Sequence, residues 1–190
     1  MLDALQNLVV RISRTWWLYF PVVLIFAGSL MALNRIGAEF PAHAAGAMPF
    51  DLQNGLATAE VYPQVAGYTD QARSLYLTFT LIDYAFPFFA GLFIAATVAF
   101  ALRNGFPDTY GAVVRRRLLP LLMLGTLFDW LENVSAAATI WLFPREFGWL
   151  PWALVAAKRC KLLFATGGNV LMLLSLLAYA GRRGLALLRR

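Results

Sequence analysis

Residues 127–133, which read LFDWLEN, place ionisable side chains inside an otherwise apolar run. Asp129, Glu132 and Asn133 are three and four residues apart, so they share one face of a helix. A charge at the middle of a bilayer costs about 2.5–3.5 kcal/mol, and residues that carry such a cost mark binding or proton-transfer sites. These three side chains are therefore the first candidates for chemistry.

Asp83 and two lysines, Lys158 and Lys161, could serve as partners for these acids. If the apolar runs are membrane helices, Asp83 and Glu132 both lie roughly 18 Å from an outer helix end, at 1.5 Å per residue. Lys158 and Lys161 lie roughly 10 and 15 Å from theirs, and their long side chains reach deeper. Acids and bases from three segments are thus expected at one level.

The cost of burial requires these charges to be compensated. The set expected to balance consists of three acids and three bases: Asp83, Asp129, Glu132, Lys158, Arg159 and Lys161. Six isolated charges would cost on the order of 15–20 kcal/mol, more than a typical folding stability of about 5–15 kcal/mol. Arg159 is about 100° away from the Lys158 face and could instead extend to lipid headgroups. We expect an internal polar cavity, in which Asp83 and Glu132 are candidate acid and base.

Four apolar runs must position these residues: 16–34, 72–102, 118–143 and 152–180. A membrane-spanning helix needs about 20 such residues. We therefore predict an all-α four-helix membrane bundle that forms one domain over residues 1–190. The flanking segments are expected to be a surface helix at 1–14, an outer loop at 35–71, an inner basic loop at 103–117 and a basic tail at 181–190.

Two flanking segments carry local signals. On the 1–14 helix, the expected apolar face consists of Leu2, Leu5, Leu8, Val9 and Ile12, with Gln6 among the polar residues elsewhere. In the outer loop, a short helix is expected to start at Thr58, with Thr58 as its N-cap. The loop is too apolar to be free and is expected to cover the outer mouth of the bundle.

The distribution of positive charge predicts the orientation. Arginines precede the first run, separate the second from the third and follow the fourth: Arg11, Arg14, Arg103, Arg115, Arg116, Arg117, Arg182, Arg183, Arg189 and Arg190. Lys and Arg concentrate in cytoplasmic segments. Both termini are therefore expected in the cytoplasm, and a bacterial inner membrane is the expected location.

Composition excludes several classes of function. The chain has 190 residues, 61% hydrophobic and 14% charged, whereas soluble domains have about 25% charged residues. The net charge of +6 lies beside apolar runs, so it indicates membrane topology rather than nucleic-acid binding. One cysteine and one histidine, Cys160 and His43, rule out a disulfide, a bis-histidine haem and a His/Cys metal site. No cofactor and no metal are expected.

Helical spacing completes the candidate ligand-binding set. Tyr76 shares a face with Asp83, and Asp51 in the outer loop is either a turn acid or a residue that closes the mouth of the site. The full set is Asp51, Tyr76, Asp83, Asp129, Glu132, Asn133, Lys158 and Lys161. The alternative is that these charges only hold helices together, because ion pairs and polar contacts between membrane helices need no chemistry.

Two resemblances extend this interpretation. The segments "IDYAFPFFAGLF", "LPLLMLGTLFDWLEN" and "KLLFATGGNVLMLLSLL" resemble a family of small bacterial four-span proteins without assigned activity. "FDLQ", with Asp51, and "IDYAFPFF", with Asp83, resemble short motifs of the EXPERA superfamily of emopamil-binding sterol isomerases and sigma-type receptors. That resemblance implies a pocket for hydrophobic, often amine-bearing or sterol-like ligands. The second-span acid is Asp rather than Glu, and the lysines of the fourth run are foreign to that family.

Three functions remain in competition with a purely structural role. The first is binding of a membrane lipid or small hydrophobic molecule, with an EXPERA-like isomerase as one form of it. The second is an accessory subunit of a larger membrane complex, in which the charges serve assembly. The third is a small proton-coupled transporter, although the absence of an inverted repeat argues against it unless the chain forms a homodimer.

Overall fold

The structure is a computed structural model that describes residues 2–188. It is helical, with no strand in that range, which confirms the predicted all-α class. The α-helices are α1 (Leu2–Arg14), α2 (Trp16–Glu39), α3 (Val61–Ala66), α4 (Asp70–Gly105), α5 (Pro107–Arg115), α6 (Leu124–Leu142) and α7 (Trp149–Leu188). The 3-10 helices are η1 (Phe40–His43), η2 (Phe50–Leu52), η3 (Thr58–Glu60) and η4 (Leu119–Met123). Arg189 and Arg190 of the predicted tail lie outside the described residues.

Three helical segments in the described part of the chain are long and apolar enough to cross a membrane: Trp16–His43, Asp70–Gly105 and Trp149–Leu188. The third predicted run is divided between η4 and α6, and α6 has only 19 residues. Asp129, Glu132 and Asn133 lower its hydropathy, and these are the residues that make it a candidate site. Apolar side chains face outward on α2 and α7, with Met31 73% and Leu163 70% exposed.

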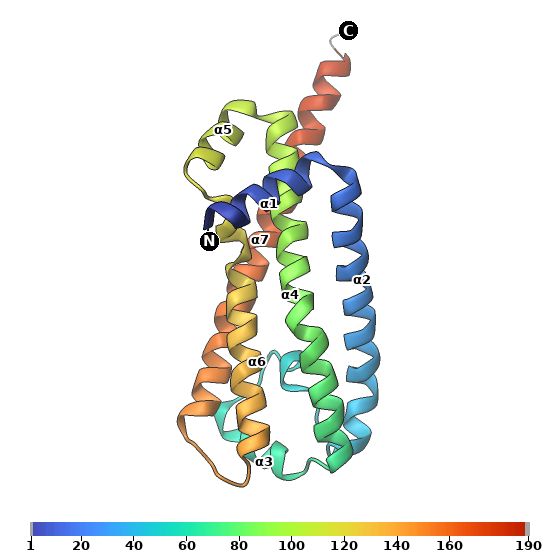
Figure 1. Ribbon diagram of the computed structural model, residues 1–190, viewed down its shortest axis with the longest axis vertical. Helices are drawn as coiled ribbons and strands as arrows, with labels where there is room; N and C mark the ends of the chain where they lie inside the picture. The colour runs from blue at the N-terminus through green and yellow to red at the C-terminus, as the bar shows by residue number, and fades with distance from the viewer. Residues whose placement is uncertain (1, 189–190) are drawn as a thin grey trace.

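Helix α4 is the central element of the fold. It packs against α1, α2, α6 and α7, and α6 and α7 also pack against each other. The four helices α2, α4, α6 and α7 run along the long axis of the molecule, with α2 on the opposite side of α4 from α6 (Figure 1). This arrangement leaves α2 supported mainly by α4, so any space between α2 and α7 depends on the side chains along α4.

The arginine-rich segments lie at one end of the molecule. Helices α1 and α5 and the last turns of α7 share the upper end in Figure 1, and α3 lies at the lower end with the turn from α6 to α7. Arg182 donates to the backbone oxygen of Gly105, and its guanidinium lies 4.8 Å from the centroid of the Phe106 ring. Helix α5 begins at Pro107 inside the segment predicted as a basic loop, and proline favours a first helical position.

Helix α1 forms as predicted, but the predicted burial of its side chains is partly wrong. Gln6 is buried and donates through Nε2 to Val114 O at 2.7 Å, so the polar residue anchors α1 to the end of α5. Leu2 and Leu8 are exposed, whereas Val9 and Ile12 are buried against α4. The contact with α5 determines which side of α1 is buried. The periodicity of the sequence of α1 could not predict this contact, because it contains no information about α5.

The long loop between α2 and α4 forms a compact cap. Phe40 and Phe50 pack edge-on against Tyr76 of α4, with ring centroids 5.7 and 5.8 Å apart. The predicted helix start at Thr58 is a short 3-10 turn, and α3 follows it from Val61. Thr58 is not the N-cap residue, because Ala57 occupies that position before η3. The backbone N–H of Ala57 donates to Glu60 Oε2 at 3.0 Å. The buried aromatic rings hold the loop, including Asp51, over the ends of the helices.

Helix α4 continues through Pro87, which removes one backbone donor. Side chains of α6 bind the carbonyl of the proline itself and that of the residue three positions before it. Thr126 Oγ1 donates to Pro87 O at 2.6 Å, and Trp130 Nε1 donates to Tyr84 O at 2.9 Å. These two bonds fix the register of α6 on α4 next to the predicted site.

Close packing of α4 on α6 gives a first testable prediction. A Cβ at Gly91 would lie 2.8 Å from Thr126 Oγ1, whose hydrogen bond to Pro87 O prevents an easy shift. We expect Gly91→Ala to destabilise the protein by about 1–3 kcal/mol through overpacking. Gly28→Ala is the control, since no atom lies within 4 Å there, and it should be neutral or stabilising by about 0.5–1 kcal/mol. Equal unfolding temperatures for the two variants would contradict the prediction.

Candidate functional site

Seven of the eight candidate ligand-binding residues meet in one buried cluster. Asp83 comes from α4, Asp129, Glu132 and Asn133 from α6, Lys158 and Lys161 from α7, and Asp51 from η2. We call these seven residues the acid–lysine cluster. Its existence follows from three helices that present polar residues at one level and from a loop that adds a fourth carboxyl group.

Lys158 and Glu132 form the most deeply buried ion pair. Lys158 Nζ lies 2.7 Å from Glu132 Oε1, and both side chains are almost completely inaccessible. The same Nζ donates to the backbone oxygen of Asp51 at 3.0 Å. Lys158 therefore connects α7 both to α6 and to the long loop.

Lys161 contacts three carboxyl groups at once. Its Nζ lies 3.1 Å from Asp129 Oδ2 and 3.0 Å from Glu132 Oε2, and it forms a further ion pair with Asp51 Oδ1. The two lysines pair with different oxygens of Glu132, Lys158 with Oε1 and Lys161 with Oε2. Electrostatic attraction from Lys161 therefore holds three carboxylates from three segments together.

Asp83 has no basic partner among residues 2–188. It is fully buried, and its Oδ2 accepts a hydrogen bond from Asn133 Nδ2 at 2.9 Å. Asn133 also donates to Asp129 Oδ1 at 3.3 Å, and the second oxygen of Asp83 has no hydrogen-bond partner within the described range. Asn133 thus links two acids, and one carboxylate oxygen remains without a donor.

The cluster holds four carboxyl groups and two ammonium groups. The balance of three acids and three bases expected from the sequence is not observed, for two reasons. Arg159 is exposed on α7 and takes no part in the ion pairs of the described chain, and Asp51 joins from the loop. If all four acids were ionised, the cluster would carry a charge of −2. A buried excess of this kind must be offset by protons or by bound positive charge.

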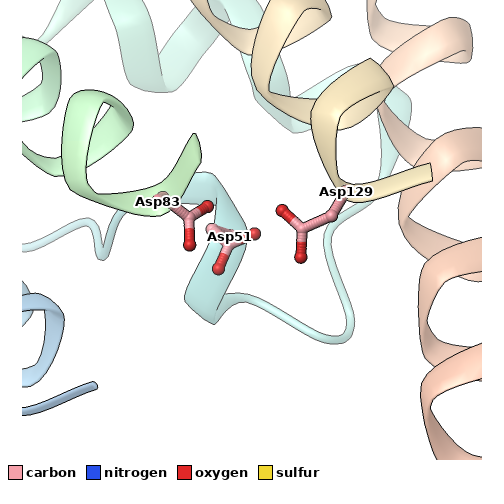
Figure 2. Close-up of side chains that lie close together, drawn as sticks. All are labelled: Asp51, Asp83 and Asp129. Carbon is pink, nitrogen blue, oxygen red and sulfur yellow. The ribbon is translucent and has the colours of Figure 1, made fainter. Parts of the chain in front are cut away.

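Three of the carboxyl groups are arranged so that they could hold a cation. Asp51, Asp83 and Asp129 each offer one oxygen, and these oxygens all lie within 4.8 Å of one another. Figure 2 shows the three side chains pointing toward a common region from three different segments. The sequence predicted no metal site because it has no His/Cys spacing. Carboxylates that converge only in three dimensions leave no such spacing.

The one remaining candidate, Tyr76, lies beside the cluster rather than in it. Tyr76 is buried on the same helix as Asp83, but its ring packs against Phe40 and Phe50 of the long loop. A role for Tyr76 in ligand binding stays a prediction.

A mostly apolar cavity of ≈ 230 Å³ reaches the cluster from the side. We call it the central cavity. Phe26 of α2, Phe93 of α4 and Ala165 of α7 line it, and its polar wall includes Asp129 and Lys161. A molecule in this cavity would therefore place one end against a carboxylate and an ammonium group and the rest against apolar side chains.

A second cavity of ≈ 470 Å³ lies next to it, toward the arginine-rich end. Arg14 and Arg103 line this basic-end cavity, together with apolar and aromatic side chains that include Trp16 and Met172. Neither arginine has a carboxylate partner in the described range. Phe93 lines both cavities, so they are neighbours along α4. Sequence reasoning missed this space, because it treated Arg14 and Arg103 only as indicators of topology.

The chain matches no protein-family model, no curated protein and no solved structure. The resemblances to four-span bacterial proteins and to the EXPERA superfamily therefore stay hypotheses.

Proposed function

We propose that the protein is a four-span integral membrane protein that binds an amphiphilic lipid or another hydrophobic molecule between α2, α4 and α7. In this proposal both termini are cytoplasmic, in a bacterial inner membrane, because the arginine-rich segments share one end of the molecule. The acid–lysine cluster then lies toward the outer side, and the basic-end cavity lies at the inner surface.

The observation that carries the proposal is the central cavity, which ends at Asp129 and Lys161. Ligand pockets are typically apolar with a few polar groups that fix orientation. An apolar chain could occupy the space beside Phe26 and Phe93, and a polar headgroup could reach the cluster. The basic-end cavity extends this space along α4 and would accept the remainder of a long molecule.

Charge favours one kind of headgroup. The cluster has two more carboxyl groups than ammonium groups, and Asp129 lies in the cavity wall. An ammonium headgroup would reduce the excess of negative charge, a hydroxyl would leave it unchanged, and a carboxylate would increase it. We therefore propose a hydrophobic amine as the preferred ligand class. The sizes of the two cavities limit the length of the aliphatic chain and the number of rings that such an amine can have.

A stability assay with three amphiphiles tests this function. Oleylamine, oleyl alcohol and oleic acid share one chain and differ only in the headgroup. In the presence of EDTA, we expect oleylamine to raise the unfolding temperature most and oleic acid least. At a free concentration of 100 Kd, binding to the folded state contributes about 2.7 kcal/mol.

Matched variants identify the place of binding. Ala90 lines the central cavity, and Ala156 is exposed on α7, outside both cavities. Ala90→Phe should abolish the stabilisation by oleylamine, because the larger ring fills the cavity, whereas Ala156→Phe should retain it. Equal stabilisation by all three amphiphiles, or full stabilisation of Ala90→Phe, would contradict the proposal.

A further inference from the structure

The acid–lysine cluster contains more carboxylate charge than its two lysines can neutralise, although Lys161 contacts both Asp51 and Asp129. Lys158 and Lys161 offset two of the four carboxylates, which leaves two negative charges. Asp83 has no contact with either lysine among the ion pairs of the described residues. The excess is therefore located on the side of the cluster where Asp83 lies.

Asp83 provides an observation that is independent of the total charge. The residue has 0% exposure, and its Oδ1 has no hydrogen-bond partner in the part of the chain that the structure describes. Its other oxygen is already bound by Asn133 Nδ2, so the carboxyl group is held in one orientation. Figure 2 shows this carboxyl group directed toward Asp51 and Asp129. A buried acceptor without a donor is costly, and coordination of a cation would remove that cost.

We propose that Asp51, Asp83 and Asp129 bind one divalent cation of the hard class, represented by Mg²⁺, Mn²⁺ and Ca²⁺. One oxygen from each residue lies within 4.8 Å of the other two, a separation that one Ca²⁺ ion can span at metal–oxygen distances of about 2.4 Å and that must shorten for the smaller Mg²⁺. Hard cations take carboxylate oxygens as ligands, and water molecules complete their coordination. A charge of +2 equals the excess of the cluster, so one ion neutralises it.

The accessibility of the three carboxylates defines a route of entry for the ion, and Asn133 supports two of them. Asp51 lies on the loop, and its side chain is 12% accessible, whereas Asp83 is closed off. The ion would enter at Asp51 and reach Asp83 last. Asn133 donates to Asp83 and Asp129 and fixes both carboxylates, as outer residues of metal sites do. Of its three ligands, only Asp129 also lines the central cavity, so the proposed ion site does not depend on the proposed function.

The test uses Mn²⁺ and the full chain in phosphatidylcholine nanodiscs. Metal is first removed with EDTA, and no amphiphile is added. Electron paramagnetic resonance of free Mn²⁺ should show saturable binding of one ion per chain. Mg²⁺ and Ca²⁺ should compete, and each should raise the unfolding temperature.

Variants with the same chemical change separate specific from general binding. Asp83→Asn removes one ligand charge but keeps an acceptor for Asn133, so the fold should be retained. Its affinity for Mn²⁺ should fall by at least about tenfold. Asp70→Asn is the matched control, because Asp70 is exposed in the first turn of the same helix. Asp51→Asn, on the loop, repeats the test without altering a membrane helix.

Three outcomes would overturn the proposal. Absence of saturable Mn²⁺ binding is one, and equal affinities of the Asp83→Asn and Asp70→Asn variants is the second. The third is stabilisation by lowered pH with no effect of any divalent cation, which would mean that two protons neutralise the cluster instead.

Discussion

Replacing Lys161 with methionine is expected to destabilise the protein more than any other single change in the acid–lysine cluster. The substitution leaves Asp51, Asp129 and Glu132 without the ammonium group that contacts all three. Breaking a buried ion pair by removal of one partner costs about 3–5 kcal/mol. Here the loss also raises the uncompensated charge from −2 to −3, so the cost should be at the upper end of that range.

The yield of monodisperse protein and its unfolding temperature in one detergent measure this effect. Arg159→Met is the control, since Arg159 is a neighbouring base on α7 with an exposed side chain. It should express and unfold like the parent protein. If Lys161→Met were as stable as Arg159→Met, the ion pairs of Lys161 would contribute nothing to the folded state, and the cluster would lose its structural basis.

Asp83→Asn is expected to act in the opposite direction and to stabilise the metal-free protein. The change removes one of the two excess negative charges. It also replaces the unpaired acceptor Oδ1 with an amide NH₂ group, which can donate to the neighbouring carboxylates. An unsatisfied buried polar atom costs about 1–3 kcal/mol, and we expect a gain of that size in EDTA. Asn133 can still donate to the remaining oxygen.

Chemical unfolding in EDTA, followed by tryptophan fluorescence, provides the measurement. Asp70→Asn should leave the free energy of unfolding unchanged within about 0.5 kcal/mol, as is usual for surface positions. A lower stability of Asp83→Asn in EDTA would mean that the Asp83 charge is compensated in the folded protein without any added cation. In saturating Mn²⁺ the advantage of the variant should disappear, since the parent protein then gains the binding energy of the ion.

Helical spacing and depth predicted most of the acid–lysine cluster. Glu132 and the two lysines could be placed at one level because rise per residue fixes depth along a helix. The polar stripe of Asp129, Glu132 and Asn133 identified the face that packs inward. These features are local, so a single sequence is enough to reveal them.

Features that depend on contacts distant in sequence could not be predicted in this way. Asp51 lies in an irregular loop, and its place above Lys158 and Lys161 depends on how Phe40 and Phe50 pack on Tyr76. The two cavities depend on how far α2 lies from α7. The burial of Gln6 depends on α5.

Asp51 is the only acid of the cluster that a loop supplies, and this has a thermodynamic consequence. Lys158 and Lys161 both hold Asp51, through its backbone oxygen and its carboxylate. Any opening of the cap would break these contacts, so such an opening would be linked to whatever occupies the interior. By reciprocity, a ligand that favours the closed cap tenfold must itself bind the closed form tenfold more tightly. Gln53 directly follows η2 in this cap. The rate at which an added protease cleaves the chain near Gln53 would then report occupancy of an interior site that the protease never contacts.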